Sequence, residues 1–252
     1  MAENDEPLVL PQDLALALSL LTRLPVPASD TSRNARAAWA YPLAGIAVAS
    51  FAALAGCIAH ASGLPAPFTA LISLTILVVT TGAMHEDGLA DTADGLWGGW
   101  TRERRLEIMK DSRIGAYGVI ALFLSLSARW AALWMLFEIG AGTAALALIV
   151  TAALSRATMP VLMTVLPHAR ETGLSQSVGK VEKNTALLAA AIGLITAILL
   201  LGTGAIPVVF WAVIVTAAIG AIARSKIGGQ TGDILGATQQ IAEIAILFSI
   251  LA

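Results

Sequence analysis

Three aspartates form the most polar stretch of this sequence. Asp87, Asp91 and Asp94 stand at positions i, i+4 and i+7, a spacing that places all three carboxylates on one face of a helix. The small residues between them leave room for a bulky polar ligand. Because like charges repel, we expect a cation among them, and hard carboxylate oxygens suit Mg²⁺ with a phosphate substrate. The sequence therefore predicts a catalytic magnesium site; the alternative is a cluster of solvated charges at a membrane surface.

Two further ionisable residues directly precede the aspartates. His85 is a candidate general base or metal ligand, and the competing interpretation is a hydrogen-bond partner that orients a neighbouring carboxylate. Glu86 lies one residue off the face of the aspartates, so we rank it below them and place it at the substrate.

A second polar cluster follows the acidic motif. Residues 102–109 have helix-forming composition, which predicts a short amphipathic helix at the membrane surface. The next four residues combine cations, a carboxylate and a hydroxyl beside a glycine. This set suits phosphate, and we place its members at the substrate: Lys110, Asp111, Ser112 and Arg113.

A glycine-rich loop, residues 228–237, reads Gly-Gly-Gln-Thr-Gly-Asp-Ile-Leu-Gly-Ala. Glycines let the backbone approach a ligand closely, and successive backbone N–H groups form an anion-binding nest. We therefore place Gly229, Thr231 and Gly232 at the substrate. Asp233, the only carboxylate of the loop, is a candidate for both metal and substrate. The alternative is a flexible turn between two apolar segments.

The elements that must position these groups are membrane helices. The chain is 57% hydrophobic with a mean hydropathy of +0.80, far above the norm for soluble proteins. We expect an all-α, polytopic helix bundle forming one catalytic domain over residues 1–252. Six apolar runs are long enough to span a bilayer, and a seventh is shorter: 37–61, 66–84, 116–137, 141–166, 185–202, 205–223 and 235–252.

Two arginines, Arg129 and Arg156, lie inside predicted spans. A charge at membrane depth is costly and usually faces the bundle interior. One interpretation is contact with an anionic substrate, to which we assign Arg156. The other is a structural pairing with Glu138 or another buried carboxylate.

The basic residues predict the orientation. Lys and Arg gather before the first span, in 85–115, in 167–184 and after residue 223, while the alternate loops carry none. By the positive-inside rule the acidic motif and the glycine-rich loop both face the cytoplasm. We therefore predict that Asp233 and the backbone of 228–232 close over the cavity that the three aspartates line.

The N-terminal region carries no spanning segment. Residues 1–11 are expected to form a polar surface tail, and their acidic start is unlike a signal peptide. The apolar segment 14–21 is too short to cross a bilayer and predicts an interfacial or re-entrant helix. The single cysteine, Cys57, has no internal disulfide partner, and the scattered basic residues argue against binding nucleic acid.

Several motifs resemble the cobalamin synthase family, the adenosylcobinamide-GDP ribazoletransferases. His-x-Asp-Gly-Leu-Ala-Asp-x-x-Asp-Gly at 85–95 and the glycine-rich loop are the most specific matches. The loop Lys-Asp-Ser-Arg-x-Gly at 110–115 is also similar. So are Leu-Thr-Arg-x-Pro-x-Pro, which contains Arg23, and Pro-His-Ala-Arg-x-x-Gly, which contains Arg170. His168 stands in that last motif where the family has a tyrosine.

The resemblance implies a Mg²⁺-dependent phosphotransferase in a bacterial inner membrane, with its active site facing the cytoplasm. It would join adenosylcobinamide-GDP to α-ribazole, or to α-ribazole 5′-phosphate, and release GMP. Arg23 would contact substrate, and Arg113 and Arg170 would neutralise charge on the pyrophosphate. The lipid bilayer is the expected surrounding, and a homo-oligomer is compatible with the sequence.

Two other functions fit parts of the pattern. Asp-x-x-Asp-Gly at 91–95 is similar to CDP-alcohol phosphotransferases, but Leu-Trp-Gly-Gly follows where that family has x-x-Ala-Arg. An ion-coupled transporter also carries charges within its spans. A transporter places its carboxylates near the membrane midplane, whereas these are expected at one face.

Overall fold

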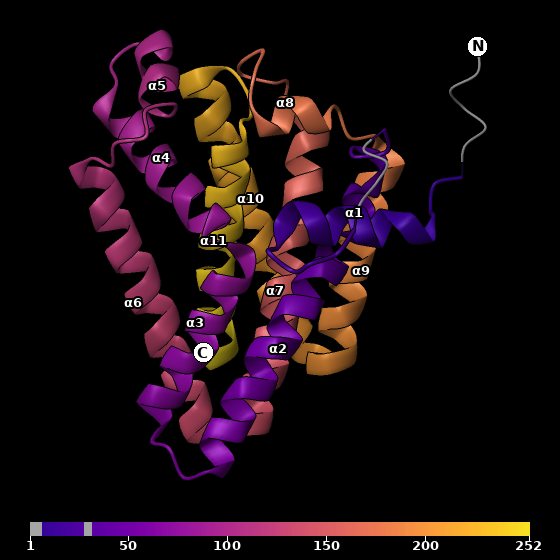
Figure 1. The fold of residues 1–252 in the computed structure, drawn as a ribbon, viewed down its shortest axis with the longest axis vertical. Helices are drawn as coiled ribbons and strands as arrows, with labels where there is room; N and C mark the ends of the chain where they lie inside the picture. The colour runs from indigo at the N-terminus through magenta and orange to yellow at the C-terminus, as the bar shows by residue number, and fades with distance from the viewer. Residues whose placement is uncertain (1–6, 28–31) are drawn as a thin grey trace.

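The chain folds into an all-helical bundle, as the sequence predicts. The computed structural model describes residues 7–27 and 32–252, and in these ranges there is no β-strand, only an isolated bridge between His168 and Gln230. Residues 1–6 of the predicted polar tail lie outside the described ranges, whereas residues 7–9 are exposed. Figure 1 shows most helices running along the bundle and α1 (Pro11–Leu21) lying across it.

Within the described part of the chain, five apolar helical runs are long enough to cross a membrane, and a sixth arises if one bent pair counts as a span. The longest run, Lys183–Ile227, has 45 residues, more than twice what one crossing needs. The short turn η2 (Gly202–Gly204) divides it into two helices. The spanning helices are α2 (Tyr41–Ala61), α6 (Ala116–Ile139), α7 (Ala141–Val165), α9 (Lys183–Leu201), α10 (Ala205–Ile227) and α11 (Gly232–Leu251).

The second predicted span is broken where the sequence showed a continuous apolar run. α3 ends at Thr81, and the next helix, α4 (Met84–Gly98), leaves it at 85°. Gly82 and Ala83 take left-handed backbone angles, with φ of 64° and 55°. A left-handed backbone conformation is rare for alanine. The continuous apolar run therefore did not predict this bend. The bend directs the acidic motif away from the axis of α3 (Ala66–Thr81).

The N-terminal helix is fastened to the bundle by a buried ion pair. Arg33 Nε donates to the Asp13 carboxylate at 2.9 Å, and Trp39 Nε1 donates to the same group at 2.9 Å. Burial raises the pKa of Asp13, but the hydrogen bonds from Arg33, Trp39 and the Leu10 backbone outweigh it and hold that pKa below its ordinary value. The short helix η1 (Arg36–Ala40) carries Trp39, so these contacts place α1 over the start of α2.

α4 and α11 pack with their backbones in contact. A Cβ added at Gly88 would lie 3.0 Å from the Asp233 carbonyl oxygen, and one at Gly236 would lie 3.3 Å from the His85 Cα. Glycine at both positions is therefore what allows this close approach. As a result, the start of α4 and the start of α11 lie side by side.

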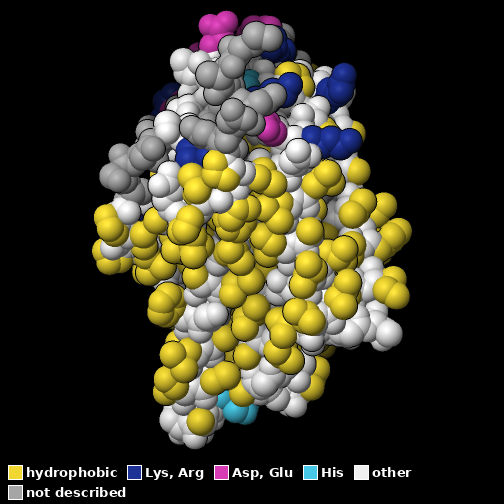
Figure 2. Space-filling model, turned by 90° about the vertical axis from the view of Figure 1, so that its right-hand side faces the viewer, with side chains coloured by type: hydrophobic (Ala, Val, Ile, Leu, Met, Phe, Trp, Pro, Cys, Tyr) yellow, Lys and Arg dark blue, Asp and Glu magenta, His cyan; other side chains and the backbone are white. Residues whose placement is uncertain are grey.

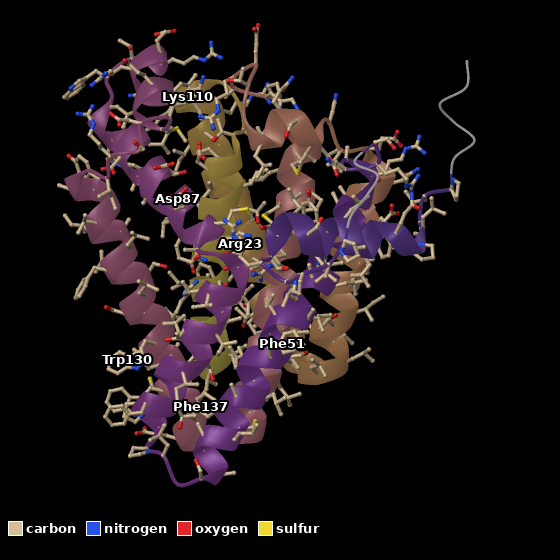
Figure 3. The ribbon with its side chains drawn as sticks, in the orientation of Figure 1. Arg23, Phe51, Asp87, Lys110, Trp130 and Phe137 are labelled. Carbon is tan, nitrogen blue, oxygen red and sulfur yellow. The ribbon has the colours of Figure 1, made fainter. Side chains whose placement is uncertain are left out.

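Charge is gathered at one end of the bundle. Figure 2 shows Lys, Arg, Asp and Glu side chains at the top, above a broad hydrophobic flank. Figure 3 places Asp87 and Lys110 in the upper half of the molecule and Trp130 and Phe137 in the lower half. The polar motifs therefore share one end of the bundle, as the pattern of basic residues predicts.

Candidate active site

A cavity of about 250 Å³ lies where α4 and α11 begin. Its polar lining comes from α4, from the loop after α7, from α8 (Leu174–Val178) and from α11. Its apolar lining comes from α1, α2 and α7, with further residues from α4, α8 and α11. Polar and apolar side chains therefore line the same cavity, which suits a ligand with a charged group and a large apolar body. The polar lining residues are His85, Asp87, Arg170, Ser175 and Asp233.

Asp87 stands between this cavity and a second one. The second hollow, of about 520 Å³, is lined by Ser19, Thr22 and Arg23 from the α1 end and by the bend between α3 and α4. The two share part of their walls, namely Leu20, Met84, Asp87 and Leu174. The structure thus brings Arg23, predicted at the substrate, to the same hollow as Asp87. The Arg23 side chain also covers Gly82, where an added Cβ would collide with it.

The other two aspartates of the triad take different positions. Asp91 is half-buried and lies within electrostatic range of Asp87, Asp94 and Asp233, but it lines neither cavity. Asp94 is buried and accepts hydrogen bonds from the backbone N–H of Gly115 at 2.7 Å and of Gly118 at 2.9 Å. Its carboxylate therefore caps the start of α6. The helical spacing is confirmed, but only Asp87 reaches the cavities.

Asp233 joins the acidic motif from the far end of the sequence. Its carboxylate accepts from Arg170 Nη2 at 3.1 Å and from the Thr231 hydroxyl at 3.1 Å. Thr231 Oγ1 also accepts from the Ile234 backbone N–H at 3.3 Å and caps α11. Gly232 and Asp233 line the same cavity as Asp87, as predicted, whereas residues 228–231 of the loop line neither cavity.

The rest of the glycine-rich loop supports its neighbours. A Cβ at Gly229 would collide with the Pro167 carbonyl oxygen, and Gln230 N–H donates to that oxygen at 2.8 Å. Gly229 therefore lets the two loops pair and does not line the cavity. His168, at the position where a tyrosine was expected, lies with its Nδ1 3.0 Å from Gln230 Nε2. Ser175 donates to Gln230 Oε1 and lines the cavity, a role that no sequence motif indicated.

Only one of the two terminal nitrogens of the Arg170 guanidinium has a hydrogen-bond partner among the described residues. Nη2 donates to Asp233, while Nη1 is buried and has no hydrogen-bond partner among the described residues. A buried N–H without a partner costs free energy that an anionic ligand would recover. The geometry therefore fits the prediction that Arg170 contacts phosphate.

His85 is buried in the same wall. Its Nε2 has no hydrogen-bond partner within the described ranges. This nitrogen therefore does not bond the carboxylate that the alternative interpretation of His85 predicted. The ring lines the cavity beside Asp87. It remains a candidate proton acceptor for a bound hydroxyl.

Glu86, placed at the substrate from its sequence position, faces the bundle interior instead. Its Oε1 accepts from Arg129 Nη2 at 2.9 Å and from Gln240 Nε2 at 3.3 Å. Arg129 also lies 3.7 Å from Glu243. The structural pairing proposed for Arg129 is thus present, but with Glu86 and Glu243; Glu138 bonds Trp134. This network links α4, α6 and α11 and lines neither cavity.

Arg156 also lies deep in the bundle. It is buried, its Nη1 donates to the Ala152 carbonyl at 3.2 Å, and it lines neither cavity. Glu243 and Glu86 lie within electrostatic range. Its surroundings match the structural alternative given for it rather than direct substrate contact.

The loop Lys110–Arg113 lies at the surface beside the site. Arg113 pairs with Asp111 at 2.7 Å, and this pairing holds the pKa of the Asp111 carboxyl below its ordinary value. Ser112 is exposed. Lys110 Nζ donates to the Thr172 hydroxyl at 3.1 Å, which links this loop to the segment that carries Arg170. None of the four residues lines either cavity.

The helix predicted at 102–109 is present as α5 (Arg102–Ile108). Its arginines form hydrogen bonds to the C-terminal end of α10. Arg102 donates to the carbonyls of Ile227 at 2.8 Å and Ala169 at 2.9 Å, and Arg105 donates to Lys226 at 3.1 Å. These bonds satisfy the last carbonyls of α10. They hold the start of the glycine-rich loop against the segment that carries Arg170.

Comparisons with known proteins give one consistent result. A family model described as Cobalamin-5-phosphate synthase matches residues 13–251. A relative from Mesorhizobium japonicum is 44% identical over 238 residues, 93% of this chain and 91% of its own length. Relatives from Bradyrhizobium diazoefficiens and Azorhizobium caulinodans are 45% and 44% identical, over 93% and 95% of this chain and 91% and 95% of theirs. All three are named Adenosylcobinamide-GDP ribazoletransferase. No solved structure matches.

Proposed function

The chain belongs to the cobalamin-5-phosphate synthase family, and from this premise we propose that it is an adenosylcobinamide-GDP ribazoletransferase. A free ribose hydroxyl oxygen of α-ribazole, or of α-ribazole 5′-phosphate, attacks the phosphorus of the adenosylcobinamide phosphate group. The bond from that phosphorus to GMP breaks, and GMP leaves. The match over residues 13–251 carries this proposal and disfavours both a CDP-alcohol phosphotransferase and a transporter.

The cavity between α4 and α11 supports the proposal by its chemistry. Arg170, with one buried N–H free of a partner, offers a donor to the pyrophosphate. Arg23, in the adjoining hollow, offers a second cation on the other side of Asp87. Charge in phosphoryl transfer spreads over several oxygens, so donors on more than one side are needed. The apolar walls suit the body of a large ligand.

The donor set beside the cavity fits Mg²⁺. Within the described ranges no group of three or more His, Cys, Asp or Glu side chains is close enough to hold a metal by itself. Mg²⁺, however, is usually bound by one or two carboxylates together with substrate phosphates and water. Asp87 and Asp233 would hold it in the cavity, with Asp91 close by. When bound, the ion would neutralise charge on the pyrophosphate oxygens.

Two groups in the cavity wall are candidate acceptors for the proton of the ribazole hydroxyl. His85 and Asp87 are neighbours on the same helix and both line the cavity. A general base must come within hydrogen-bond reach of the proton that it removes. Both candidates satisfy the requirement of lining the space where that hydroxyl would bind.

We place the cavity at the cytoplasmic face of a bacterial inner membrane. The apolar helices support membrane insertion, and the basic loops gather at the cavity end of the bundle. The rule that basic loops remain cytoplasmic supports this orientation. The activated corrinoid would then reach the site from the cytoplasm.

The test is an assay with the purified full-length protein in detergent. Adenosylcobinamide-GDP, α-ribazole and Mg²⁺ are supplied, and GMP and adenosylcobalamin are measured by liquid chromatography. We expect equal amounts of the two products. A CDP-activated alcohol donor serves as control and should release no CMP. CMP release with no turnover of adenosylcobinamide-GDP would overturn the proposal.

A further inference from the structure

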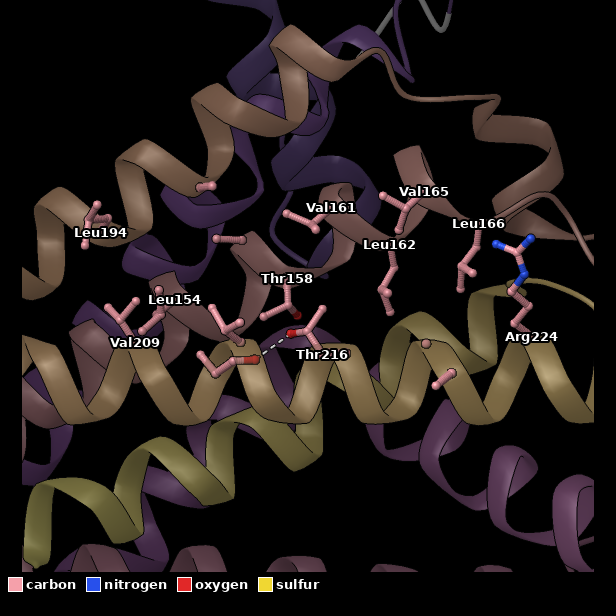
Figure 4. A pocket seen from close by; sticks show the side chains of 17 residues that line it. Leu154, Thr158, Val161, Leu162, Val165, Leu166, Leu194, Val209, Thr216 and Arg224 are labelled. Carbon is pink, nitrogen blue, oxygen red and sulfur yellow. Dashed lines mark hydrogen bonds between the residues drawn. The ribbon is translucent and has the colours of Figure 1, made fainter.

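A long apolar groove runs along the outside of the bundle between α7, α9 and α10. It has a volume of about 520 Å³, and it shares no lining residue with either cavity of the active site. Figure 4 shows its walls, with Leu194 and Val209 at one end and Arg224 at the other. Nothing in the proposed reaction uses it.

The walls of the groove offer hydrocarbon and almost nothing else. Apart from Arg224 its only polar lining residues are Thr158 and Thr216. Thr158 donates its hydroxyl to the Ser155 carbonyl at 2.6 Å, and Thr216 donates to the Ala212 carbonyl at 2.6 Å. Both hydroxyls are thus satisfied within their own helices. The surface left for a ligand is apolar, which excludes a nucleotide or another polar metabolite.

The surroundings of the groove are also apolar. Only 17% of the most apolar window in the run Lys183–Ile227 is buried inside the protein. In a spanning segment, the remaining surface meets lipid hydrocarbon. The groove therefore opens toward acyl chains.

The dimensions favour a single extended chain. From Val209 to Arg224 the helix rises roughly 22 Å at 1.5 Å per residue, longer than the ~15 Å of hydrocarbon in one leaflet. Spread over that length, the volume of about 520 Å³ describes a narrow groove, which an extended acyl chain would fill along its long axis.

The charge at one end indicates the headgroup. Arg224 is exposed in the last turn of α10, at the charged end of the bundle, and it forms no ion pair with any described residue. A basic side chain at the membrane surface attracts anionic lipid headgroups. An acyl chain in the groove would bring its lipid phosphate to this guanidinium.

We propose that the groove between α7, α9 and α10 binds one acyl chain of an anionic phospholipid, with Arg224 contacting the headgroup. The lipid fills the space that the diverging helices α9 and α10 leave open. It would thereby stabilise the outer helices of the bundle without entering the reaction.

Photolabelling tests this site directly. The full-length protein is placed in phosphatidylcholine vesicles that contain a small fraction of phosphatidylglycerol with a diazirine on its acyl chain. Parallel vesicles contain diazirine-labelled phosphatidylcholine instead. Labelled peptides are identified by mass spectrometry. We expect several-fold more label on groove residues of α7 and α10 from phosphatidylglycerol than from phosphatidylcholine.

Two pairs of variants sharpen the test. Ala217→Trp fills the groove, whereas Ala218→Trp places the same ring on the neighbouring exposed position outside it. Only the first should abolish groove labelling. Arg224→Gln should equalise labelling by the two lipids, while Lys183→Gln, at another exposed basic position, should not. Gel filtration checks that each variant remains folded.

Three results would overturn the proposal. The first is label spread evenly over all lipid-facing helices and unaffected by Ala217→Trp. The second is equal labelling by the two lipids in the unmodified protein, which would contradict the role of Arg224. The third is disulfide-linked dimer from Ala217→Cys in a Cys57→Ser background together with weak groove labelling, which would assign the groove to a second copy.

Discussion

Arg170 and Asp233 form an ion pair of 3.1 Å in the wall of the cavity, although 63 residues separate them in the sequence. Arg170 comes from the loop after α7 and Asp233 from the first turn of α11. The pair and Asp87 line the same cavity. The ion pair also leaves Arg170 Nη1 available to an anion.

We predict that Asp233→Asn lowers turnover by about 100-fold or more. The substitution removes an anionic ligand of the proposed Mg²⁺ ion and the negative charge that pairs with Arg170. Steady-state GMP release measures this. Glu107→Gln, which breaks the exposed pair with Arg104, is the matched control and should leave turnover unchanged. Turnover within twofold of the unmodified protein in Asp233→Asn would remove Asp233 from the site.

The close contact of α4 with α11 gives a second prediction. Gly88→Ala should lower turnover by about tenfold or more, because a Cβ there would lie 3.0 Å from the Asp233 carbonyl oxygen and would push the two helices apart. Gly98→Ala is the control on the same helix, since its Cβ would meet nothing closer than 3.7 Å. Equal activities of the two variants would show that this spacing does not matter.

Asp94 has two possible roles that substitutions separate. As a cap of α6 it should contribute about 1 kcal/mol, so Asp94→Ala should lower the melting temperature in detergent. Asn offers one acceptor oxygen where Asp94 uses two, so Asp94→Asn should retain only part of that stability. If the carboxylate charge also serves the metal, as its spacing predicts, Asp94→Asn should still lose turnover. Full activity in Asp94→Asn would restrict Asp94 to the cap.

The orientation can be tested by labelling single cysteines in a Cys57→Ser background. Cysteines at Ser112 and Ser225 should react with a membrane-impermeant maleimide only from the cytoplasmic side, and a cysteine at Thr203 only from the outside. All three positions are exposed. Reaction of Ser112→Cys from the outside would contradict the cytoplasmic placement of the cavity.

The sequence predicted what depends on local composition. Apolar runs of sufficient length gave the spanning helices, and the spacing of the aspartates gave the helix α4. The bend at Gly82–Ala83 could not be read, because it lies within a continuous apolar run. Helix spacing also could not show that Asp94 meets the start of α6, because that contact is tertiary.

Contacts between residues that lie far apart in the sequence could not be predicted either. Glu86 and Arg129 are 43 residues apart, and only the folded chain shows that they bond to each other rather than to a substrate. Ser175 gave no signal, since its place in the cavity wall follows from the path of a loop. The motifs identified the acidic helix and the glycine-rich loop, and the packing of α4 on α11 brought them together.

The most direct measurement is GMP release from adenosylcobinamide-GDP and α-ribazole by purified Asp87→Asn protein. Asp87 lines both cavities, so loss of its charge should reduce turnover by at least about 100-fold, and chelation of Mg²⁺ should do the same to the unmodified protein. Glu103→Gln, on the exposed surface of α5, should remain active. Asp87→Asn protein that is folded and turns over at the normal rate with Mg²⁺ would contradict the account.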